Sequence, residues 1–308
     1  MQVDHITGLT LAVVAMVLYG VYMVPRKKSR ISQSSYTFWM GLGALLCAGL
    51  LGLVFRGIVL VTHFQLALML ISGVVWATGT HAYCRGVQLI GLARSTPIKN
   101  TSAMLGTIFG ILILHEFSFH KVFPLVLVML GSAAIVVSAT ILGLVEANGD
   151  GDLKITSSRA IPYGIACSVW AAISYSVYTI PMKILFGQGV GPSTFLFYMS
   201  VGCFVGMSLT ALVTRPRKDS IPVTWRDRNL AMLSGAMWAV GSMGANIAVK
   251  LIGVAITWPL TKTTLVAVLY GVLVLREIDV ARHKRTLTNG LVLSLIGVAL
   301  LAWATAVH

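Results

Sequence analysis

The stretch "YGVYMVPRKK" at residues 19–28 returns, reworded, as "YSVYTIPMKI" at residues 175–184. Both copies keep the order Tyr, Val, Tyr, Pro and Lys, at a constant shift of 156 residues. A second pair, "SGVVWATG" (72–79) and "SGAMWAVG" (234–241), follows in the same order at a shift of 162 residues. The chain therefore contains an internal repeat whose two copies divide it near the middle.

The composition is that of a membrane protein. The 308 residues are 57% hydrophobic and 10% charged, and the mean hydropathy is +0.87. Apolar runs of about 20 residues, enough to cross a hydrocarbon core of about 30 Å as a helix, recur along the chain. There are ten of them, at 6–24, 36–55, 64–84, 92–114, 122–144, 160–180, 193–213, 230–249, 253–275 and 288–306. Backbone groups in lipid must be satisfied within their own segment, which predicts an all-α polytopic membrane protein with ten transmembrane helices.

The repeat divides these helices into five and five. We expect residues 1–145 to form the first repeat, 146–159 a polar linker, and 160–308 the second repeat of one integrated membrane domain. Because five is an odd number, the second copy enters the membrane upside down. Inverted repeats with a site between them at the midplane are the usual architecture of alternating-access transporters.

The net charge of +14 would suggest nucleic acid in a soluble protein, but here the loops explain it. Of the 23 Lys and Arg residues, 17 lie in or beside the loops after the first, third, fifth, seventh and ninth runs. This bias predicts that those loops are cytoplasmic and that both termini lie on the non-cytoplasmic side. We expect a multi-pass protein of a bacterial inner (plasma) membrane that is a monomer or a homodimer. We expect the lipid bilayer to be its partner, and we expect it to bind no nucleic acid.

Enzyme chemistry finds no support in the sequence. The chain lacks a nucleotide-binding G-x-x-x-x-G-K-[ST] loop, clustered His, Asp and Glu ligands, and any nucleophile–base spacing. The four cysteines lie in apolar runs without a C-x-x-C pair, and Asp150 and Asp152 of the linker lack a complete calcium loop. We therefore expect no enzyme activity, no cofactor and no metal.

Several motifs resemble the drug/metabolite transporter superfamily, in particular its glucose/ribose porter and rhamnose–proton symporter branch. They are "VPRKK" (24–28), "FWMGLG" (38–43), "SGVVWATGT" (72–80), "GLARSTPI" (91–98) and "GTIFGILILHE" (106–116). The resemblance implies ten helices built as five plus five and uptake of a sugar, sometimes with a proton, by alternating access. Lys99 departs from the sugar-porter pattern, which has a small polar residue there.

Aromatic residues flanked by hydroxyls form the first candidate site. Ser72, Trp76 and Thr80 are four residues apart and share one helix face. The second copy repeats them as Ser234, Trp238 and Ser242. An indole with hydroxyls at its rim is a platform for a sugar, whereas close helix packing around Gly73 is the alternative. Tyr19 and Tyr175 would join this site, and an interfacial aromatic belt would instead explain Tyr22 and Tyr178.

Two lysines inside apolar runs form the second candidate site. Lys99 follows a proline in "RSTPIKNTS" (94–102), and Lys262 follows one in "WPLTKTT" (258–264). Each costs about 2.5–3.5 kcal/mol at the bilayer centre on insertion scales. Either the pair faces a shared cavity as cations for the substrate, or each donates to carbonyls of a helix broken by Pro97 or Pro259.

These considerations give a set of candidate residues. The substrate-binding candidates are Tyr19, Trp76, Thr80, Lys99, Asn100, Tyr175, Trp238, Asn246, Trp258 and Lys262. His81 is a candidate for proton coupling, with an ordinary hydrogen-bonded interior histidine as the alternative. Glu116 and Glu277 are candidate gate residues, with solvated helix ends as the alternative, and no acidic residue lies at a midplane position.

We expect a secondary transporter that moves a small polar metabolite, most simply a sugar, by alternating access. The second hypothesis is an exporter or exchanger of an anionic or zwitterionic metabolite (sugar phosphate, organic acid or amino acid) that uses Lys99 and Lys262 as counter-ions. A membrane scaffold or enzyme is the hypothesis of another class. Protons are a candidate second partner beside the small-molecule substrate.

Overall fold

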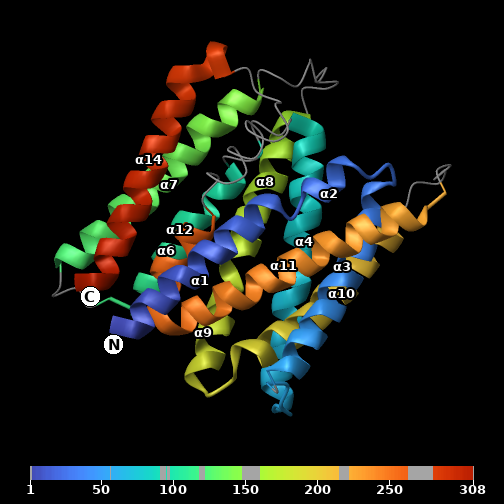
Figure 1. The fold of residues 1–308 in the computed structure, drawn as a ribbon. Helices are drawn as coiled ribbons and strands as arrows, with labels where there is room; N and C mark the ends of the chain where they lie inside the picture. The colour runs from blue at the N-terminus through green and yellow to red at the C-terminus, as the bar shows by residue number, and fades with distance from the viewer. Residues whose placement is uncertain are drawn as a thin grey trace.

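The computed structural model describes residues 2–55, 57–90, 95, 98–117, 122–147, 160–214, 222–262 and 280–307. All regular elements in these ranges are helices (Figure 1). They are α1 (Gln2–Val21), α2 (Val24–Lys27), α3 (Gln33–Val54), α4 (His63–Ile90), α6 (Ser102–Leu112), α7 (Val122–Ala147), α8 (Ala160–Val177), α9 (Thr179–Gly187), α10 (Pro192–Thr214), α11 (Trp225–Ile252), α12 (Val254–Thr261) and α14 (Val280–Val307).

Within the described residues, eight helical spans are long and apolar enough to cross a membrane. They are Val3–Arg26, Gln33–Val54, His63–Gly86, Val122–Leu142, Ile161–Gly187, Pro192–Thr214, Trp225–Ile252 and His283–Val307. Each coincides with one of the ten predicted apolar runs, so the all-α multi-pass prediction is confirmed. The two other runs, 92–114 and 253–275, are described only in part, as α6 and α12.

The helices that begin at His63 and Trp225 start with the same kind of cap. Ahead of α4, Thr62 Oγ1 accepts from the Gln65 backbone N at 3.3 Å, and Gln65 Oε1 accepts from the Thr62 backbone N at 3.1 Å. Ahead of α11, Thr224 Oγ1 accepts from the Asp227 backbone N at 3.2 Å. Such caps satisfy backbone donors that the first turn of a helix leaves without a partner.

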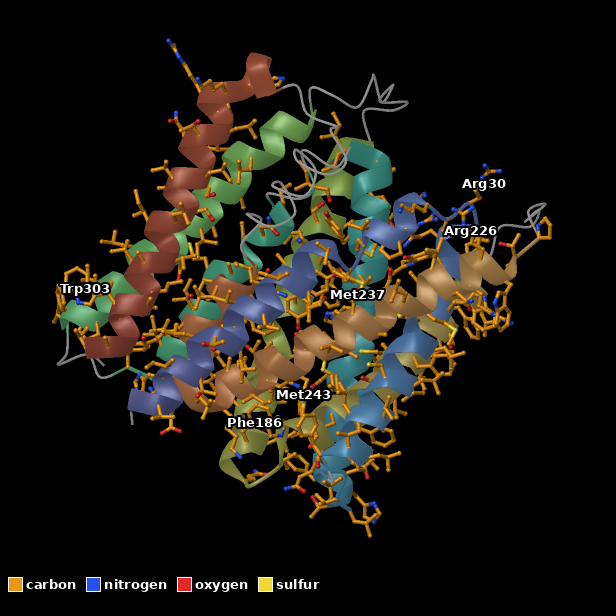
Figure 2. The ribbon with its side chains drawn as sticks, viewed as in Figure 1. Arg30, Phe186, Arg226, Met237, Met243 and Trp303 are labelled. Carbon is orange, nitrogen blue, oxygen red and sulfur yellow. The ribbon has the colours of Figure 1, made fainter. Side chains whose placement is uncertain are left out.

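Asp227 and Gln65, in the first turns of these two helices, also bind a loop from the other half of the chain. Asp227 Oδ1 accepts from Ser29 Oγ and from the Arg30 backbone N, both at 3.0 Å. Gln65 Nε2 donates to Gln188 Oε1 at 3.2 Å. Arg30 and Arg226 accordingly lie at the same end of the bundle in Figure 2. The loop after α2 is thus tied to α11, and the loop after α9 is tied to α4.

Two membrane-spanning segments are interrupted near their ends. The first breaks between α1 and α2, and the other breaks at Tyr178 between α8 and α9. Pro25 and Pro181 lie in the first turn of the helix that follows each break. A proline there lacks only an N–H that the first turn leaves unbonded, and it cannot continue a preceding helical ladder. The repeated stretch that opened the sequence analysis is therefore the stretch in which both helices break.

The packing joins helices from the two halves of the chain. Two groups of three helices can be distinguished. In one, the long helix α4 packs on α8 and α10, and in the other the long helix α11 packs on α1 and α3. The pairs α3–α10 and α6–α12 also pack together, and α7 and α14 form a pair at one side of the bundle (Figure 1).

Glycines allow the closest of these approaches. A Cβ on Gly73 of α4 would lie 2.1 Å from the carbonyl oxygen of Met199 in α10. A Cβ on Gly235 of α11 would lie 2.0 Å from the carbonyl oxygen of Met40 in α3. The predicted packing role of Gly73 is present, because only a residue without a side chain fits there.

We predict that Gly73→Ala and Gly235→Ala each destabilise the protein by about 1–3 kcal/mol, since the added methyl group must push two backbones apart. Gly187→Ala is the matched control, because a Cβ there would have nothing within 4 Å. Thermal unfolding of the purified protein in detergent measures the effect. Midpoints that are equal for all three variants would contradict the close approach.

Candidate functional site

Two buried indoles meet at the centre of the bundle. Trp76 of α4 and Trp238 of α11 have ring centroids 4.5 Å apart and planes inclined by 39°. Their side chains are 4% and 3% exposed. Trp76 also lies 6.1 Å from the ring of Tyr175 in α8. The structure therefore brings together the two tryptophans that the repeat singled out.

Two tyrosines flank this pair, and each is hydrogen-bonded to a hydroxyl that follows one of the tryptophans by four residues. Tyr175 Oη donates to Thr80 Oγ1 at 3.0 Å. Tyr19 Oη and Ser242 Oγ are 2.8 Å apart. Because positions four apart share one helix face, each hydroxyl lies beside the indole of its own helix. The bonds fix both phenol rings next to the tryptophan pair.

Lys262 follows the last turn of α12 and lies among aromatic rings. Its Nζ atom is 4.6 Å from the centroid of Trp258, 5.2 Å from that of Tyr19 and 5.6 Å from that of Tyr175. The side chain is half-buried, so part of it borders open space. Ammonium groups at such distances from ring faces are attracted by the negative face of the ring.

Trp258 is held tightly in this arrangement. Its ring meets that of Tyr178 edge-on at 5.3 Å. A Cβ on Gly106 of α6 would lie 2.3 Å from Trp258 Cδ1, so the indole packs directly on that helix. Tyr178 is buried, and the prediction that it belongs to an interfacial belt is therefore wrong. The sequence shows Tyr178 as the repeat partner of Tyr22, but not which helix it faces.

Of the remaining substrate-binding candidates, Lys99 lies beside an aromatic ring and the two asparagines are buried. Lys99 Nζ is 5.0 Å from the centroid of Tyr83, and Tyr83 packs against the same core as Trp76 and Trp238. Asn100 and Asn246 are buried, and their Nδ2 atoms have no hydrogen-bond partner. Asn246 follows Ser242 by four residues, on the same face of α11.

Contacts thus link Tyr19, Trp76, Thr80, Tyr175, Trp238, Trp258 and Lys262 into one network, which we call the aromatic centre. Sequence reasoning left Tyr83, Tyr178 and Ser242 out of the candidate set. The signal for Ser242 was present, since it occupies the place of Thr80 in the second copy. Pro97 lies outside the described residues, so its effect on the helix before Lys99 is not placed.

His81 lies in a different place. It lines a pocket of 580 Å³ at the ends of α3, α4, α8 and α10, together with Gln33, Arg85, Tyr163 and other side chains. None of the residues of the aromatic centre lines this pocket. A role in proton coupling stays a prediction, and it would act away from the aromatic centre.

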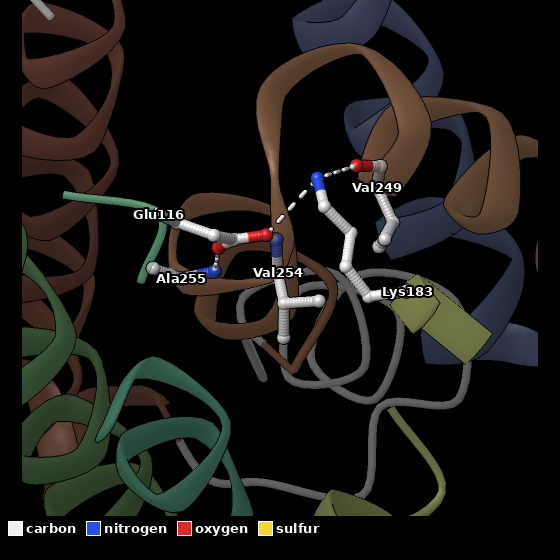
Figure 3. Close-up of polar contacts among 5 residues, drawn as sticks. All are labelled: Glu116, Lys183, Val249, Val254 and Ala255. Atoms are coloured by element: carbon white, nitrogen blue, oxygen red, sulfur yellow. Dashed lines mark hydrogen bonds and ion pairs between the residues drawn. The ribbon is translucent and has the colours of Figure 1, made fainter. Parts of the chain in front are cut away.

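Glu116, in the segment after α6, is buried in a network that joins the three helices α9, α11 and α12 (Figure 3). Its Oε1 accepts from the Val254 backbone N, and its Oε2 accepts from the Ala255 backbone N, both at 2.8 Å. Lys183 Nζ of α9 lies 3.1 Å from Glu116 Oε1 and donates to the Val249 carbonyl of α11 at 3.3 Å. The Glu116 side chain is 7% exposed and that of Lys183 is 29% exposed, so Glu116 is not a solvated helix end.

Local backbone geometry places this carboxylate. His115, three residues after the end of α6, adopts a left-handed φ of 50° and directly precedes Glu116. Gly253 between α11 and α12 has φ 83°, and a Cβ there would lie 2.9 Å from Glu116 Cδ. The carboxylate thus caps the N-terminus of α12, where orphan N–H groups and the helix dipole favour negative charge. Glu277, its predicted counterpart, lies outside the described residues.

The aromatic centre presents groups that can bind a small ligand. Among the described residues, no three His, Cys, Asp or Glu side chains gather as they would around a metal ion. Flat apolar rings edged by hydroxyl, amide and ammonium groups instead match a small ligand with one apolar face and a polar rim.

Comparisons with known proteins agree with this chemistry. "Probable glucose uptake protein GlcU" of Bacillus anthracis is 24% identical over 93% of this chain and 94% of its own length. "Glucose uptake protein GlcU" of Bacillus subtilis is 24% identical over 73% of this chain and 74% of its own. A solved crystal structure with 15% sequence identity superposes with a TM-score of 0.73 over 95% of this chain and 97% of that one, which shows a shared fold.

A family model described as "Sugar transport protein" matches residues 10–304, which is nearly the whole chain. The match spans both halves, including every residue of the aromatic centre. The chain is therefore a member of the sugar transport protein family.

Proposed function

We propose that this protein takes up a monosaccharide across the membrane by alternating access, with the aromatic centre as its binding site. The observation that carries this proposal is the buried Trp76–Trp238 pair with a hydrogen-bonded tyrosine on each side. A sugar ring has apolar C–H faces that stack on indoles and hydroxyls that exchange hydrogen bonds with phenols and hydroxyls.

The inverted repeat belongs to this proposal. Three kinds of interaction recur between equivalent positions of the two halves: the Tyr–hydroxyl bonds, the threonine caps of α4 and α11, and the glycine contacts of those helices. Tyr19 in one half bonds to Ser242 in the other, and its equivalent Tyr175 bonds to Thr80, the equivalent of Ser242. Such exchange is what two copies related by a two-fold axis in the membrane plane would produce.

The interrupted helices support a site beside the breaks. The breaks between α1 and α2 and at Tyr178 fall three residues after Tyr19 and Tyr175. Irregular backbone at membrane depth is tolerated where it is enclosed by protein or lines a water-filled cavity. Transporters commonly place their sites at such discontinuous helices.

We further propose that the Glu116–Lys183 pair is the gate on the non-cytoplasmic side. His5 near the N-terminus and Thr305 near the C-terminus line the same pocket as Glu116 and Lys183. The distribution of basic residues puts both termini outside. Opening this end would separate the carboxylate from Lys183 and the start of α12, which in the present conformation are held together.

Transport and its site can be tested together in proteoliposomes with labelled glucose. We predict that Trp76→Phe and Trp238→Phe raise the KM for uptake about fivefold or more, because loss of the indole weakens stacking by about 1 kcal/mol. Trp303→Phe is the matched control, since Trp303 is exposed on α14 away from the centre (Figure 2). Equal KM values for all three variants would place the sugar elsewhere.

The gate can be tested by labelling from outside the cell. In a variant lacking Cys47, Cys84, Cys167 and Cys203, the replacement Thr257→Cys introduces a thiol at a fully buried position of α12 beyond Glu116. We predict that adding Lys183→Gln raises the rate of its reaction with an impermeant thiol reagent about 5–30-fold, as expected if closure loses about 1–2 kcal/mol. Adding Lys284→Gln, at an exposed lysine of α14, serves as control. If Lys183→Gln leaves the rate unchanged, the pair does not hold this end closed.

A further inference from the structure

Among the described residues, no carboxylate is an ionic partner of the Lys262 ammonium group. Its contacts are with the ring faces of Tyr19, Tyr175 and Trp258, and none of the described carboxylates forms an ion pair with it. Ring faces attract the charge but accept few of its hydrogen bonds, and a lysine has three N–H donors. A charge in the membrane interior is costly unless it is paired. Lys262 is therefore placed to receive an acceptor that the described part of the chain does not supply.

Buried hydrogen-bond donors without a partner also occur in the described chain, one of them on the indole beside Lys262. Trp258 Nε1, Asn100 Nδ2 and Asn246 Nδ2 are buried without a partner, and the indole nitrogen can only donate. The other buried, unpartnered side-chain atoms in the described chain are hydroxyl oxygens, which can donate as well as accept. A neutral sugar brings donors and acceptors in equal measure, whereas this surplus of donors fits a ligand rich in acceptors.

A second positive charge faces the same region. Lys99 lies over Tyr83 at the edge of the aromatic core, and its charge repels that of Lys262. The carboxylate of Glu116 is already engaged by Lys183 and by two backbone N–H groups. The local field at Lys262 therefore favours a negatively charged ligand.

We propose that the sugar carried by this protein bears an acidic group, a carboxylate or a phosphate, which lies against Lys262 Nζ while the sugar ring packs on the aromatic centre. This inference rests on the proposed function and names its substrate class. A lysine gives such a group a charge-assisted hydrogen bond without requiring bidentate geometry, so both acidic groups suit it. Asn100, Asn246 and Trp258 Nε1 then donate to the ring hydroxyls and the acidic group.

The experiment compares initial rates of uptake of labelled glucuronate, glucose 6-phosphate and glucose into proteoliposomes of equal protein content. We expect the wild type to take up at least one acidic sugar about tenfold faster than glucose. Lys262→Gln should lower the acidic-to-neutral ratio about 10–150-fold, the range for loss of a hydrogen bond to a charged group. Lys262→Arg keeps the charge and should retain part of the preference, and Lys284→Gln should behave like the wild type.

A folding defect is separated from a binding defect by a second measurement. Quenching of tryptophan fluorescence in detergent by unlabelled glucuronate or glucose 6-phosphate reports binding near one or more of the seven tryptophans without requiring transport, and thermal unfolding reports the fold. If the quenching saturates with glucuronate alone, the acidic group is a carboxylate, and if it saturates with glucose 6-phosphate alone, the acidic group is a phosphate. Either result supports the proposal.

The contrary outcomes are distinct. Uptake of glucose with exclusion of both acidic sugars, or an unchanged ratio in Lys262→Gln, overturns this inference and leaves sugar uptake at the aromatic centre standing. Accumulation of none of the three sugars by folded wild-type protein overturns the proposed function, and this inference with it.

Discussion

The stacking of Trp76 on Trp238 is the interaction on which the rest of the structure depends. These indoles belong to α4 and α11, helices from opposite halves of the chain, and their contact lies where those halves meet. Aromatic pairs contribute about 0.5–1.5 kcal/mol beyond the area they bury. Their larger effect here is positional, because each indole lies one helical turn before a hydroxyl that is hydrogen-bonded to a tyrosine of the other half. The binding chemistry is thus built from side chains that also hold the halves together.

One buried polar network forms where the backbone is interrupted. The break at Gly253 exposes the N–H groups of Val254 and Ala255, and Glu116 satisfies both while pairing with Lys183. In lipid each of those groups would be costly without a partner. The carboxylate is therefore stabilising while the three elements stay together, and it would have to find other partners if they separate. This dependence on a single arrangement is what makes the pair suited to a gate.

The helices and most of the aromatic centre follow from the sequence by simple physical rules. Hydropathy finds the eight long spans, since lipid leaves no alternative to apolar helices, and the repeat points to Trp76, Trp238, Tyr19 and Tyr175. Contacts between residues that are far apart in the sequence cannot be predicted by these rules. Glu116 reads as a solvated helix end because the left-handed turn at His115 and the cap on α12 leave no periodic signal. Tyr178 reads as interfacial because its depth depends on Trp258, 80 residues later.

The location of the sugar is the central claim, and the structure of the protein with labelled or heavy-atom-substituted sugar bound tests it most directly. The account predicts sugar density between the Trp76–Trp238 pair and Lys262, with its hydroxyls near Tyr19 and Tyr175. Density in the 580 Å³ pocket beside His81, with the aromatic centre unchanged, would contradict it.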